Sequence, residues 1–223
     1  MTDTSAQRLN MVESQVRPSD VTDRRIIRAM LNVPREIFVQ AALASTAYMD
    51  VDVPVETAPA TGAGRSLLAP RVLAKLIQAA GIEANMKVLD VGCATGYSTA
   101  IIAALARDVT GLESSASLVA SAQKALAQLA IGNARVVQGP LEAGLPAQGP
   151  FDAILLNGAI AVAPSVLLDQ LADGGRLVGV FAEGYFGQAC VWRRIGKQID
   201  RQVVFDAGAH ALPGFAAKAE FVF

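Results

Sequence analysis

Histidine and cysteine are scarce in this chain of 223 residues, which contains one histidine (His210) and two cysteines (Cys93 and Cys190). A single histidine argues against a histidine-based metal site and against a Ser-His-Asp triad. Two cysteines do not make the disulfide framework that is typical of small secreted domains. We therefore expect no metal site, and a chemistry that needs no histidine base.

The chain also has no excess of positive over negative residues, and it has no long run of uncharged residues. Nineteen Lys and Arg oppose twenty Asp and Glu, and the basic residues are scattered, which argues against a nucleic-acid partner. The longest uncharged stretches, 91–106 and 153–168, contain polar residues, Gly or Pro and are shorter than a membrane span. Residues 1–10 are polar and lack the apolar core of a secretory signal. We expect a soluble cytoplasmic protein without a membrane partner, working as a monomer or homodimer.

The most informative segment that is present runs from Lys87 to Tyr97, KVLDVGCATGY. An apolar strand containing Asp90 leads into a loop with Gly92 and Gly96, and a helix of small residues follows. Glycine lets the backbone turn sharply and approach a ligand, and the helix start offers free N–H groups. The spacing Asp-x-Gly-x-x-x-Gly differs from the dinucleotide pattern G-x-G-x-x-G. It resembles the loop that binds the nucleoside and methionine in S-adenosylmethionine-dependent methyltransferases.

A second short strand, 109–113, ends in Glu113, about 23 residues after Asp90. In nucleoside-binding α/β folds an acid at this place can accept hydrogen bonds from both ribose hydroxyls. Taken alone, Glu113 could equally be a solvated carboxylate and the glycines an ordinary turn. The ordered set of strand, glycine loop, helix, strand and acid favours a nucleoside site.

Strand and helix patterns alternate along most of the chain. Strands are expected at 87–91, 109–113, 134–138, 153–157 and 176–180, with the clearest intervening helices at 118–130 and 164–171. This alternation predicts an α/β fold with a doubly wound, mostly parallel, seven-stranded sheet. The stretches 188–195 and 202–206 predict a terminal antiparallel hairpin. Ligands of such sheets bind at the carboxyl ends of the strands.

The N-terminal part has a different character. Apolar residues at helical spacing follow Thr22 and Asp23, either of which can cap a helix, and Pro70 fits the first turn of another. The stretch 50–64, rich in Pro, Gly and Thr, predicts an irregular loop. We expect residues 1–80 to form a helical segment with an acceptor loop, packed on a cofactor-binding domain of residues 81–223 as one compact unit.

Over nearly its whole length the chain resembles the protein-L-isoaspartate (D-aspartate) O-methyltransferase family. The segment VPREIFV at 33–39 is similar to a family signature, and 67–76 occupies the place of the family's active-site loop and following helix. VLDVGCATGYSTA, FDAILLNGAI and LADGGRLVGV correspond to the cofactor loop and to the fourth and fifth strands. The resemblance implies S-adenosyl-L-methionine as cofactor and O-methylation of isoaspartyl residues in damaged proteins or peptides.

The resemblance also implies a set of cofactor-binding residues, which lie at the ends of the predicted strands. They are Asp90, Gly92, Cys93, Ala94, Gly96, Tyr97, Glu113, Ser114, Gly139, Pro140, Leu141 and Asn157.

Two departures from the family pattern affect the site. Leu68 stands where the family has a serine that positions the isoaspartyl carboxylate; Ser66 is the candidate substitute, although it starts about 6–7 Å away along an extended chain. Pro140 stands where the family has an acid that contacts the adenine amino group. Losing that contact would cost about 1–3 kcal/mol of cofactor binding, unless Glu142 or a backbone carbonyl compensates.

The absence of a histidine base fits a carboxylate acceptor, which is already ionised at neutral pH. Leu68 and Pro140 keep two alternatives open. One is a methyltransferase of the same fold with another acceptor, such as a small molecule, and the other is a non-catalytic cofactor-binding module.

Overall fold

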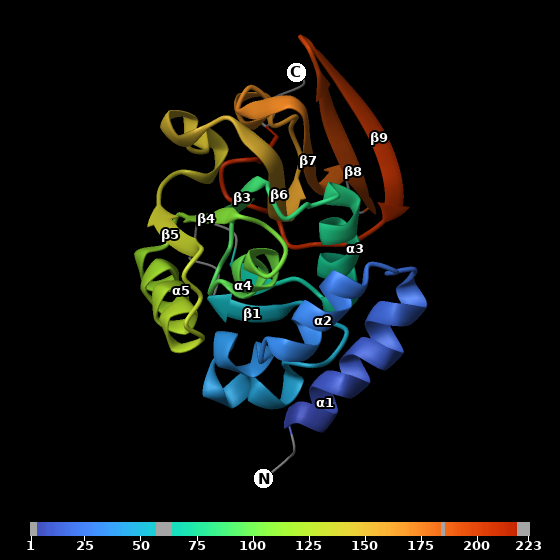
Figure 1. Ribbon diagram of the computed structural model, residues 1–223, viewed down its shortest axis with the longest axis vertical. Helices are drawn as coiled ribbons and strands as arrows, with labels where there is room; N and C mark the ends of the chain where they lie inside the picture. Colours follow the sequence, from blue (N-terminus) through green and yellow to red (C-terminus); the bar gives the residue numbers. More distant parts are fainter. Residues whose placement is uncertain (1–3, 57–63, 184–185, 218–223) are drawn as a thin grey trace, which may run out of the picture.

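A seven-stranded sheet forms the centre of the molecule (Figure 1). The computed structural model describes residues 4–56, 64–183 and 186–217. The strand order is β5-β4-β3-β6-β7-β8-β9, in which the first five strands are parallel and β8 and β9 are antiparallel to their neighbours. The strands are β3 (Lys87–Val91), β4 (Asp108–Glu113), β5 (Ala134–Gln138), β6 (Phe151–Ile160), β7 (Leu171–Glu183), β8 (Phe186–Ile195) and β9 (Gln198–Asp206). The predicted doubly wound sheet with a terminal hairpin is confirmed.

Side chains that alternate along β3 face two separate hydrophobic clusters, as strand geometry requires. Val88 belongs to a cluster with residues of α3 (Pro70–Ala80), α4 (Tyr97–Ala103) and α5 (Ala116–Gln128). Leu89 belongs to the opposite cluster, with residues of the short helix α6 (Ser165–Leu168) and of the C-terminal segment. Burial on both faces explains the nearly continuous apolar runs of the central strands.

The N-terminal segment packs on the face that carries α3, α4 and α5, and lies at the bottom of Figure 1. In α2 (Arg24–Asn32), Asp23 is the N-cap and its side chain accepts a hydrogen bond from the Arg25 N–H over 2.8 Å. The other elements of the segment are α1 (Thr4–Met11), a π-helical turn (Val12–Val16) and the 3₁₀ turns η2 (Arg17–Ser19), η3 (Arg35–Phe38) and η4 (Ala41–Thr46).

A small antiparallel ribbon follows, made of β1 (Val53–Glu56) and β2 (Arg65–Leu67). The sequence predicted an irregular loop over 50–64, so β1 is a correction: Val53 and Val55 alternate with Pro54 and Glu56 and are buried. Residues 57–63 of that predicted loop lie outside the described residues.

The predicted helix over 164–171 is wrong beyond Leu168. Leu171 already pairs with Phe151 in the parallel ladder, and the Phe151 N–H donates to the Gln170 carbonyl over 2.8 Å. The spacing of the leucines suggested one helical face, but Leu171 belongs to a buried strand. Strands β6 and β7 also extend further than predicted, through register shifts in their pairing.

The C-terminal segment returns to the middle of the sheet, which the sequence did not indicate. The N–H of Ala159 in β6 donates to the His210 carbonyl over 2.7 Å, and the Leu212 N–H donates to the Ala159 carbonyl over 2.8 Å. Leu212 and Phe215 are consequently buried near the end of β6, beside the edge where ligands of such sheets bind.

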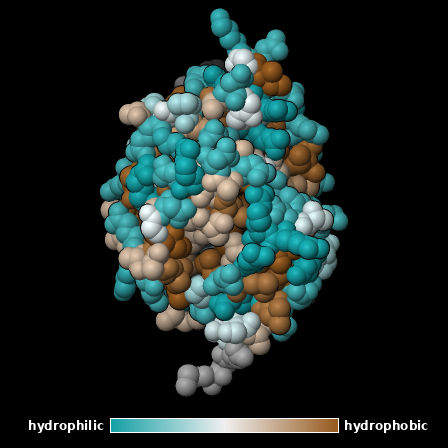
Figure 2. Space-filling view, viewed as in Figure 1, coloured by the Kyte–Doolittle hydropathy of each residue, from teal (hydrophilic) through white to brown (hydrophobic). Residues whose placement is uncertain are grey.

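Hydrophilic residues cover much of the face seen in Figure 2, with hydrophobic residues between them. Among the helices of the described residues, none combines the length and the apolar character needed to cross a lipid bilayer.

Candidate active site

The glycine loop after β3 has the backbone conformation that its sequence predicts. Gly92 and Gly96 have φ values of +71° and +92°, and Ala94 between them has +51°. A Cβ at Gly92 would lie 2.7 Å from Nη2 of Arg65 and from Cδ2 of Leu212. Glycine is therefore required at Gly92 both by its conformation and by the close approach of other groups.

Asp90 is fully buried at the carboxyl end of β3. Its Oδ2 accepts hydrogen bonds from Ser98 Oγ (2.7 Å) and Thr99 Oγ1 (2.6 Å), and its Oδ1 accepts one from the Asn157 amide. Burial raises the pKa of this carboxyl from its usual 3.8 to about 6, although the three donors oppose the rise. The network joins two predicted residues, Asp90 and Asn157, into one rigid unit.

Glu113, the predicted ribose ligand, is also fully buried. Its Oε1 accepts from the Ser114 N–H (2.7 Å) and the Ser115 N–H (3.3 Å), and its Oε2 accepts from the Ala94 N–H (2.9 Å). Glu113 thus joins the end of β4 to the glycine loop, as a shared ligand site requires.

Arg65 of β2, which the sequence analysis did not single out, lies against both of these parts. Its Nε and Nη2 donate to Oε2 of Glu113 over 3.2 and 3.0 Å, and Nη2 also donates to the Gly92 carbonyl over 2.5 Å. Together with Leu212 from the C-terminal segment, Arg65 fills the space in front of Gly92.

Two predicted residues of the glycine loop direct their side chains into the protein. The Cys93 thiol lies over Gly111, where an added Cβ would be 2.9 Å from the sulfur, and burial raises the pKa of this thiol. Tyr97 packs edge-on against Phe38, at 5.4 Å between ring centroids, with the Arg35 guanidinium 4.7 Å from its centroid. The Cys93 N–H donates to the Leu112 carbonyl over 3.3 Å, so the backbone and the side chain of Cys93 both take part in the packing around the loop.

The loop after β5 lies beside Glu113, because the Gly139 N–H donates to the Glu113 carbonyl over 3.0 Å. Pro140 is exposed and is the N-cap of the 3₁₀ turn η5 (Leu141–Ala143), whereas the side chain of Leu141 is buried. A second 3₁₀ turn, η6 (Pro146–Gln148), precedes β6. The loop that we predict to lie beside the adenine is therefore next to Glu113.

The predicted acceptor loop is buried. Ser66 and Leu68 are 6% and 3% exposed, and Leu68 belongs to the hydrophobic cluster below the sheet. The Leu68 carbonyl accepts a hydrogen bond from Nη2 of Arg35 over 2.8 Å, and the Ala69 N–H donates to Oδ1 of Asp52 over 2.7 Å. Side chains of the N-terminal segment thus fix the backbone on both sides of the Leu68–Ala69 bond.

The acceptor loop and the cofactor loop meet at a small cavity of about 10 Å³. Residues of both loops and of α3, α4 and β6 line it: Ser66, Leu67, Leu68, Leu73, Gly92, Cys93, Ala94, Tyr97, Ser98 and Asn157. None of these side chains carries a formal charge.

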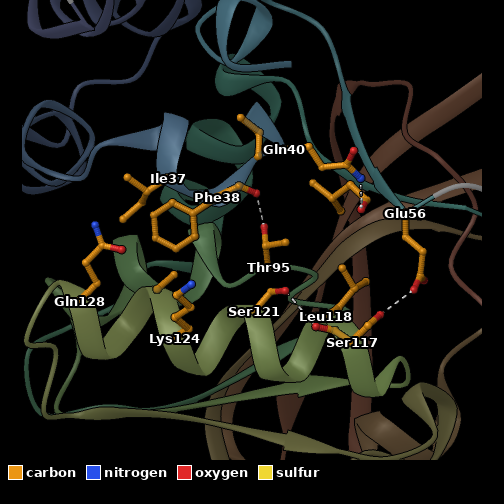
Figure 3. Close-up of a pocket in the computed structure, with 13 residues that line it drawn as sticks. Ile37, Phe38, Gln40, Glu56, Thr95, Ser117, Leu118, Ser121, Lys124 and Gln128 are labelled. Carbon is orange, nitrogen blue, oxygen red and sulfur yellow. Dashed lines mark hydrogen bonds between the residues drawn. The ribbon is translucent and has the colours of Figure 1, made fainter. Parts of the chain in front are cut away.

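Two larger hollows flank this cavity. The first, of about 590 Å³, lies between α5 and the segment around Phe38 (Figure 3). Thr95 of the glycine loop also lines it, and the Thr95 hydroxyl donates a hydrogen bond to the Phe38 carbonyl over 2.6 Å. The second, of about 720 Å³, lies beside Ala69 and is lined by Asp52 and His210, whose side chains contact over 2.8 Å. The small cavity is the candidate reaction site, because Gly92 with its positive φ lines it and because two other lining residues, Ser98 and Asn157, donate hydrogen bonds to the buried Asp90 behind it.

The residues around Gly92 fit an S-adenosyl cofactor. Glu113 would offer a carboxylate to a ribose diol, Gly92 allows close approach of the backbone, and Asp90 is a buried acid near the loop. The fit requires Arg65 and Leu212 to move from Gly92. Within the described ranges, no group of three or more His, Cys, Asp or Glu residues could hold a metal ion.

Residues 6–209 match the sequence profile of the protein-L-isoaspartate(D-aspartate) O-methyltransferase family. The chain belongs to this family. It is 40% identical over 174 residues to a protein-L-isoaspartate O-methyltransferase of Synechococcus sp. (strain JA-2-3B'a(2-13)), covering 78% of this chain and 69% of the relative. A Koribacter versatilis relative of the same name is 37% identical, with 80% and 78% covered. The family predicted from the sequence is confirmed.

Two solved structures share the fold. One, a protein-L-isoaspartate O-methyltransferase, superposes with a TM-score of 0.81 at 21% identity, covering 93% of this chain and 66% of the other. The other is a Plasmodium falciparum protein of that family, in complex with S-adenosyl-L-homocysteine, with a TM-score of 0.75 at 21% identity and with 94% and 97% covered. These similarities confirm the predicted methyltransferase fold.

Sequence reasoning missed several residues of the site. Ser98 and Thr99 could have been found, because hydroxyls in the first turn of a helix after a strand–loop unit lie near the strand end. Arg35 lies within the VPREIFV segment, but no local sequence pattern links it to Leu68. Arg65 and Leu212 gave no signal, since their partners are far away in the sequence.

Proposed function

We propose that this protein transfers a methyl group from S-adenosyl-L-methionine to the side-chain carboxylate of L-isoaspartyl residues in damaged proteins or peptides. The observation that carries the proposal is the shared cavity, which Ser66 and Leu68 of the acceptor loop line together with Gly92 and Asn157. The family membership supports it, because the related proteins from Synechococcus and Koribacter bear the name of this activity.

Each part of the cofactor has a corresponding group in this chain. Glu113 would accept the ribose hydroxyls, and the backbone from Gly92 to Gly96 would lie along the methionine part. The loop 139–141 would lie beside the adenine, and Asp90 with Asn157 would close the site from the sheet. When bound, the cofactor supplies a methyl group on a positively charged sulfur, which passes to the acceptor oxygen and leaves a neutral methyl ester and S-adenosylhomocysteine.

The protein need not supply a general base. A carboxylate with a pKa near 4 is ionised at neutral pH, so its oxygen is already nucleophilic. The task of the chain is to hold this oxygen in line with the methyl group and to exclude water. The cavity has an apolar wall made by Leu67, Leu68 and Leu73, which helps to exclude water.

A different acceptor is the second candidate, and the burial of Leu68 favours it. This side chain packs in the hydrophobic cluster and provides no hydroxyl where the family has its serine. A small-molecule acceptor, or a cofactor-binding module without catalysis, would need no such hydroxyl.

A methyl-transfer assay tests the proposal directly. An isoaspartyl peptide and the same peptide with a normal aspartyl residue are compared at saturating cofactor, and S-adenosylhomocysteine binding is measured by calorimetry. We expect methylation of the isoaspartyl peptide alone. Firm cofactor binding with no transfer to either peptide would favour the second candidate.

We also propose a cytoplasmic location, a monomer or homodimer, and a division of labour within one compact unit. Residues 1–80 would supply the acceptor loop and 81–223 the cofactor site. Cys93 and Cys190 are both free and buried, which suits a reducing compartment. Met30 and Ile101, on either side of the proposed division, belong to the same hydrophobic cluster, which supports a single unit.

A further inference from the structure

The Arg65–Glu113 ion pair differs from the other salt bridges of the described residues. Its two side chains are 3% and 0% exposed, whereas every other pair in those residues has a partner that is at least 45% exposed. Buried charges of this kind need a partner of opposite sign, because removal from water is expensive for each of them. The guanidinium of Arg65 is therefore bound to the acid that the proposed function assigns to the ribose.

Glu113 has no free capacity for a further ligand at Oε2. This oxygen accepts from the Ala94 N–H and from two nitrogens of Arg65, while Oε1 faces the N–H groups of Ser114 and Ser115. The guanidinium also lies directly in front of Gly92, because a Cβ added to Gly92 would be only 2.7 Å from Nη2 of Arg65. A ribose bound to Glu113 and a guanidinium in its present place exclude one another.

A displaced Arg65 remains next to the acceptor loop. It belongs to the same short strand as Ser66 and precedes Leu68 by three residues. The cavity that Ser66, Leu68 and Gly92 line contains no charged side chain. A guanidinium keeps its charge at any physiological pH, so it needs a new anion when it leaves Glu113.

We propose that Arg65 exchanges Glu113 for the carboxylate of the acceptor once the cofactor has bound. This inference rests on the proposed function, in which the acceptor is an isoaspartyl carboxylate. Arg65 then takes over the positioning that the family assigns to the serine replaced by Leu68. A guanidinium can hold one carboxylate oxygen and leave the other free to receive the methyl group.

The exchange also favours product release. The methyl ester is neutral, so it binds a guanidinium more weakly than the carboxylate does. Arg65 returns to Glu113 when S-adenosylhomocysteine leaves, which restores the buried pair.

Arg35, the other buried arginine near Leu68, is not available for this role. Its Nε donates to the Ala47 carbonyl over 2.7 Å and its Nη2 donates to the Leu68 carbonyl over 2.8 Å. It is fully buried behind the loop. Arg35 therefore positions the backbone, and Arg65 is the cation that faces the cofactor edge.

Two variants of Arg65 test the exchange, with Arg71→Gln as the matched control, since Arg71 is an exposed arginine paired with Asp50. We measure S-adenosylhomocysteine binding to the peptide-free proteins by calorimetry. We expect Arg65→Gln to bind it as tightly as the native protein does, or up to about tenfold more tightly. We expect the KM for an isoaspartyl peptide to rise about tenfold to a hundredfold, with a smaller change in kcat. Arg65→Lys should recover part of the loss in KM, and Arg71→Gln should resemble the native protein.

Peptide binding to the protein saturated with S-adenosylhomocysteine gives a second readout, and thermal unfolding checks that each variant is folded. Weaker S-adenosylhomocysteine binding in folded Arg65→Gln would overturn the displacement. An unchanged peptide KM and an unchanged peptide affinity would overturn the carboxylate contact. If the native protein binds S-adenosylhomocysteine but methylates no isoaspartyl peptide, the proposed function and the carboxylate contact fail together, while the binding comparison still decides whether Arg65 is displaced.

Discussion

Arg35, with no exposed surface, donates a hydrogen bond to the backbone carbonyl of Leu68. Burial lowers the pKa of this guanidinium, and no carboxylate pairs with it among the contacts of the described residues. A buried cation without an acid is costly. The arrangement indicates that Arg35 serves to hold the Leu68 side of the acceptor-loop backbone, while Asp52 holds the Ala69 side.

Arg35→Met should therefore disturb the acceptor side of the site more than the cofactor side. The change leaves the carbonyls of Ala47 and Leu68 without a donor, and we expect a loss of about 2 kcal/mol or more in the free energy of unfolding. Urea unfolding measures this loss, with Arg28→Met on the exposed face of α2 as the control. A peptide KM equal to that of the native protein would contradict the positioning role.

Glu113→Gln should weaken S-adenosylhomocysteine binding by about 2–4 kcal/mol, because charged hydrogen bonds to the ribose are lost. It also leaves Arg65 buried beside a neutral amide, so the unfolding temperature should fall. Calorimetry on the folded fraction separates the two effects. Equal affinity in native protein and variant would show that Glu113 does not hold the ribose.

The raised pKa of Asp90, about 6, predicts two effects of pH. Folded Asp90 keeps its proton up to about pH 6, whereas the unfolded chain loses it near 3.8, so its contribution to stability falls as the pH rises from about 4 to 6. The size is on the order of 3 kcal/mol at most. Cofactor affinity should change in the opposite direction, because Asp90 borders the glycine loop assigned to the methionine part, and its ionised form attracts the ammonium group of that part.

Dissociation constants for S-adenosylhomocysteine between pH 5 and pH 8 check the second effect. Asp90→Asn should flatten the profile, whereas Asp108→Asn, at an exposed salt bridge with Arg135, should not. A native profile without an inflection near pH 6 would count against the role of Asp90.

Leu68→Ser restores the family residue and should raise turnover on isoaspartyl peptides by about fivefold, the value of one aligned hydrogen bond of roughly 1 kcal/mol. The backbone should stay in place, since Arg35 and Asp52 hold both sides of the Leu68–Ala69 bond. Loss of a buried leucine should lower stability by about 2–4 kcal/mol. Leu67→Ser, next to it and equally buried, is the control that should lower stability without raising turnover.

Ser66→Ala distinguishes the other possibility at this loop. If native activity is robust and disappears in Ser66→Ala, then Ser66 carries the positioning role, and Leu68→Ser should add little.

Pro140→Asp should tighten S-adenosylhomocysteine binding by about tenfold, since it supplies an acceptor for the adenine amino group. Pro140 is exposed at the N-cap of η5, where aspartate is a favoured residue, so the unfolding temperature should change little. Pro146→Asp, at the start of η6, is the matched control. Weaker binding by folded Pro140→Asp would refute the adenine contact.

The sequence predicted the parts of the site whose signals are local. Asp90, Gly92 and Gly96 lie within seven residues, and their strand–loop–helix pattern is visible in the letters alone. The predicted helix over 164–171 was too long at its end. Leu171 has helical spacing from Leu167 and Leu168, but it is part of strand β7 and pairs with Phe151 of β6.

The parts that were missed depend on contacts between distant segments. Arg65 reaches Glu113 across 48 residues, and Leu212 reaches the glycine loop from the other end of the chain. Their positions follow from the packing of the β1–β2 ribbon and of the C-terminal segment over the sheet edge. No periodicity or spacing in one sequence encodes such a contact.

The bridge between Ala159 and Ala211 has a consequence for synthesis on the ribosome. Strands β3, β4 and β5 are neighbours in the sheet in the order of their synthesis, whereas β6 returns to the far side of β3, and Leu212 can reach Gly92 only after all of these strands have been made. Before that point the glycine loop lacks the Leu212 part of its cover, and Arg65 alone fills the space in front of Gly92, while Asp90 and Glu113 are already on adjacent strands. A nascent chain stalled before residue 207 should capture nucleoside more readily than the finished protein does.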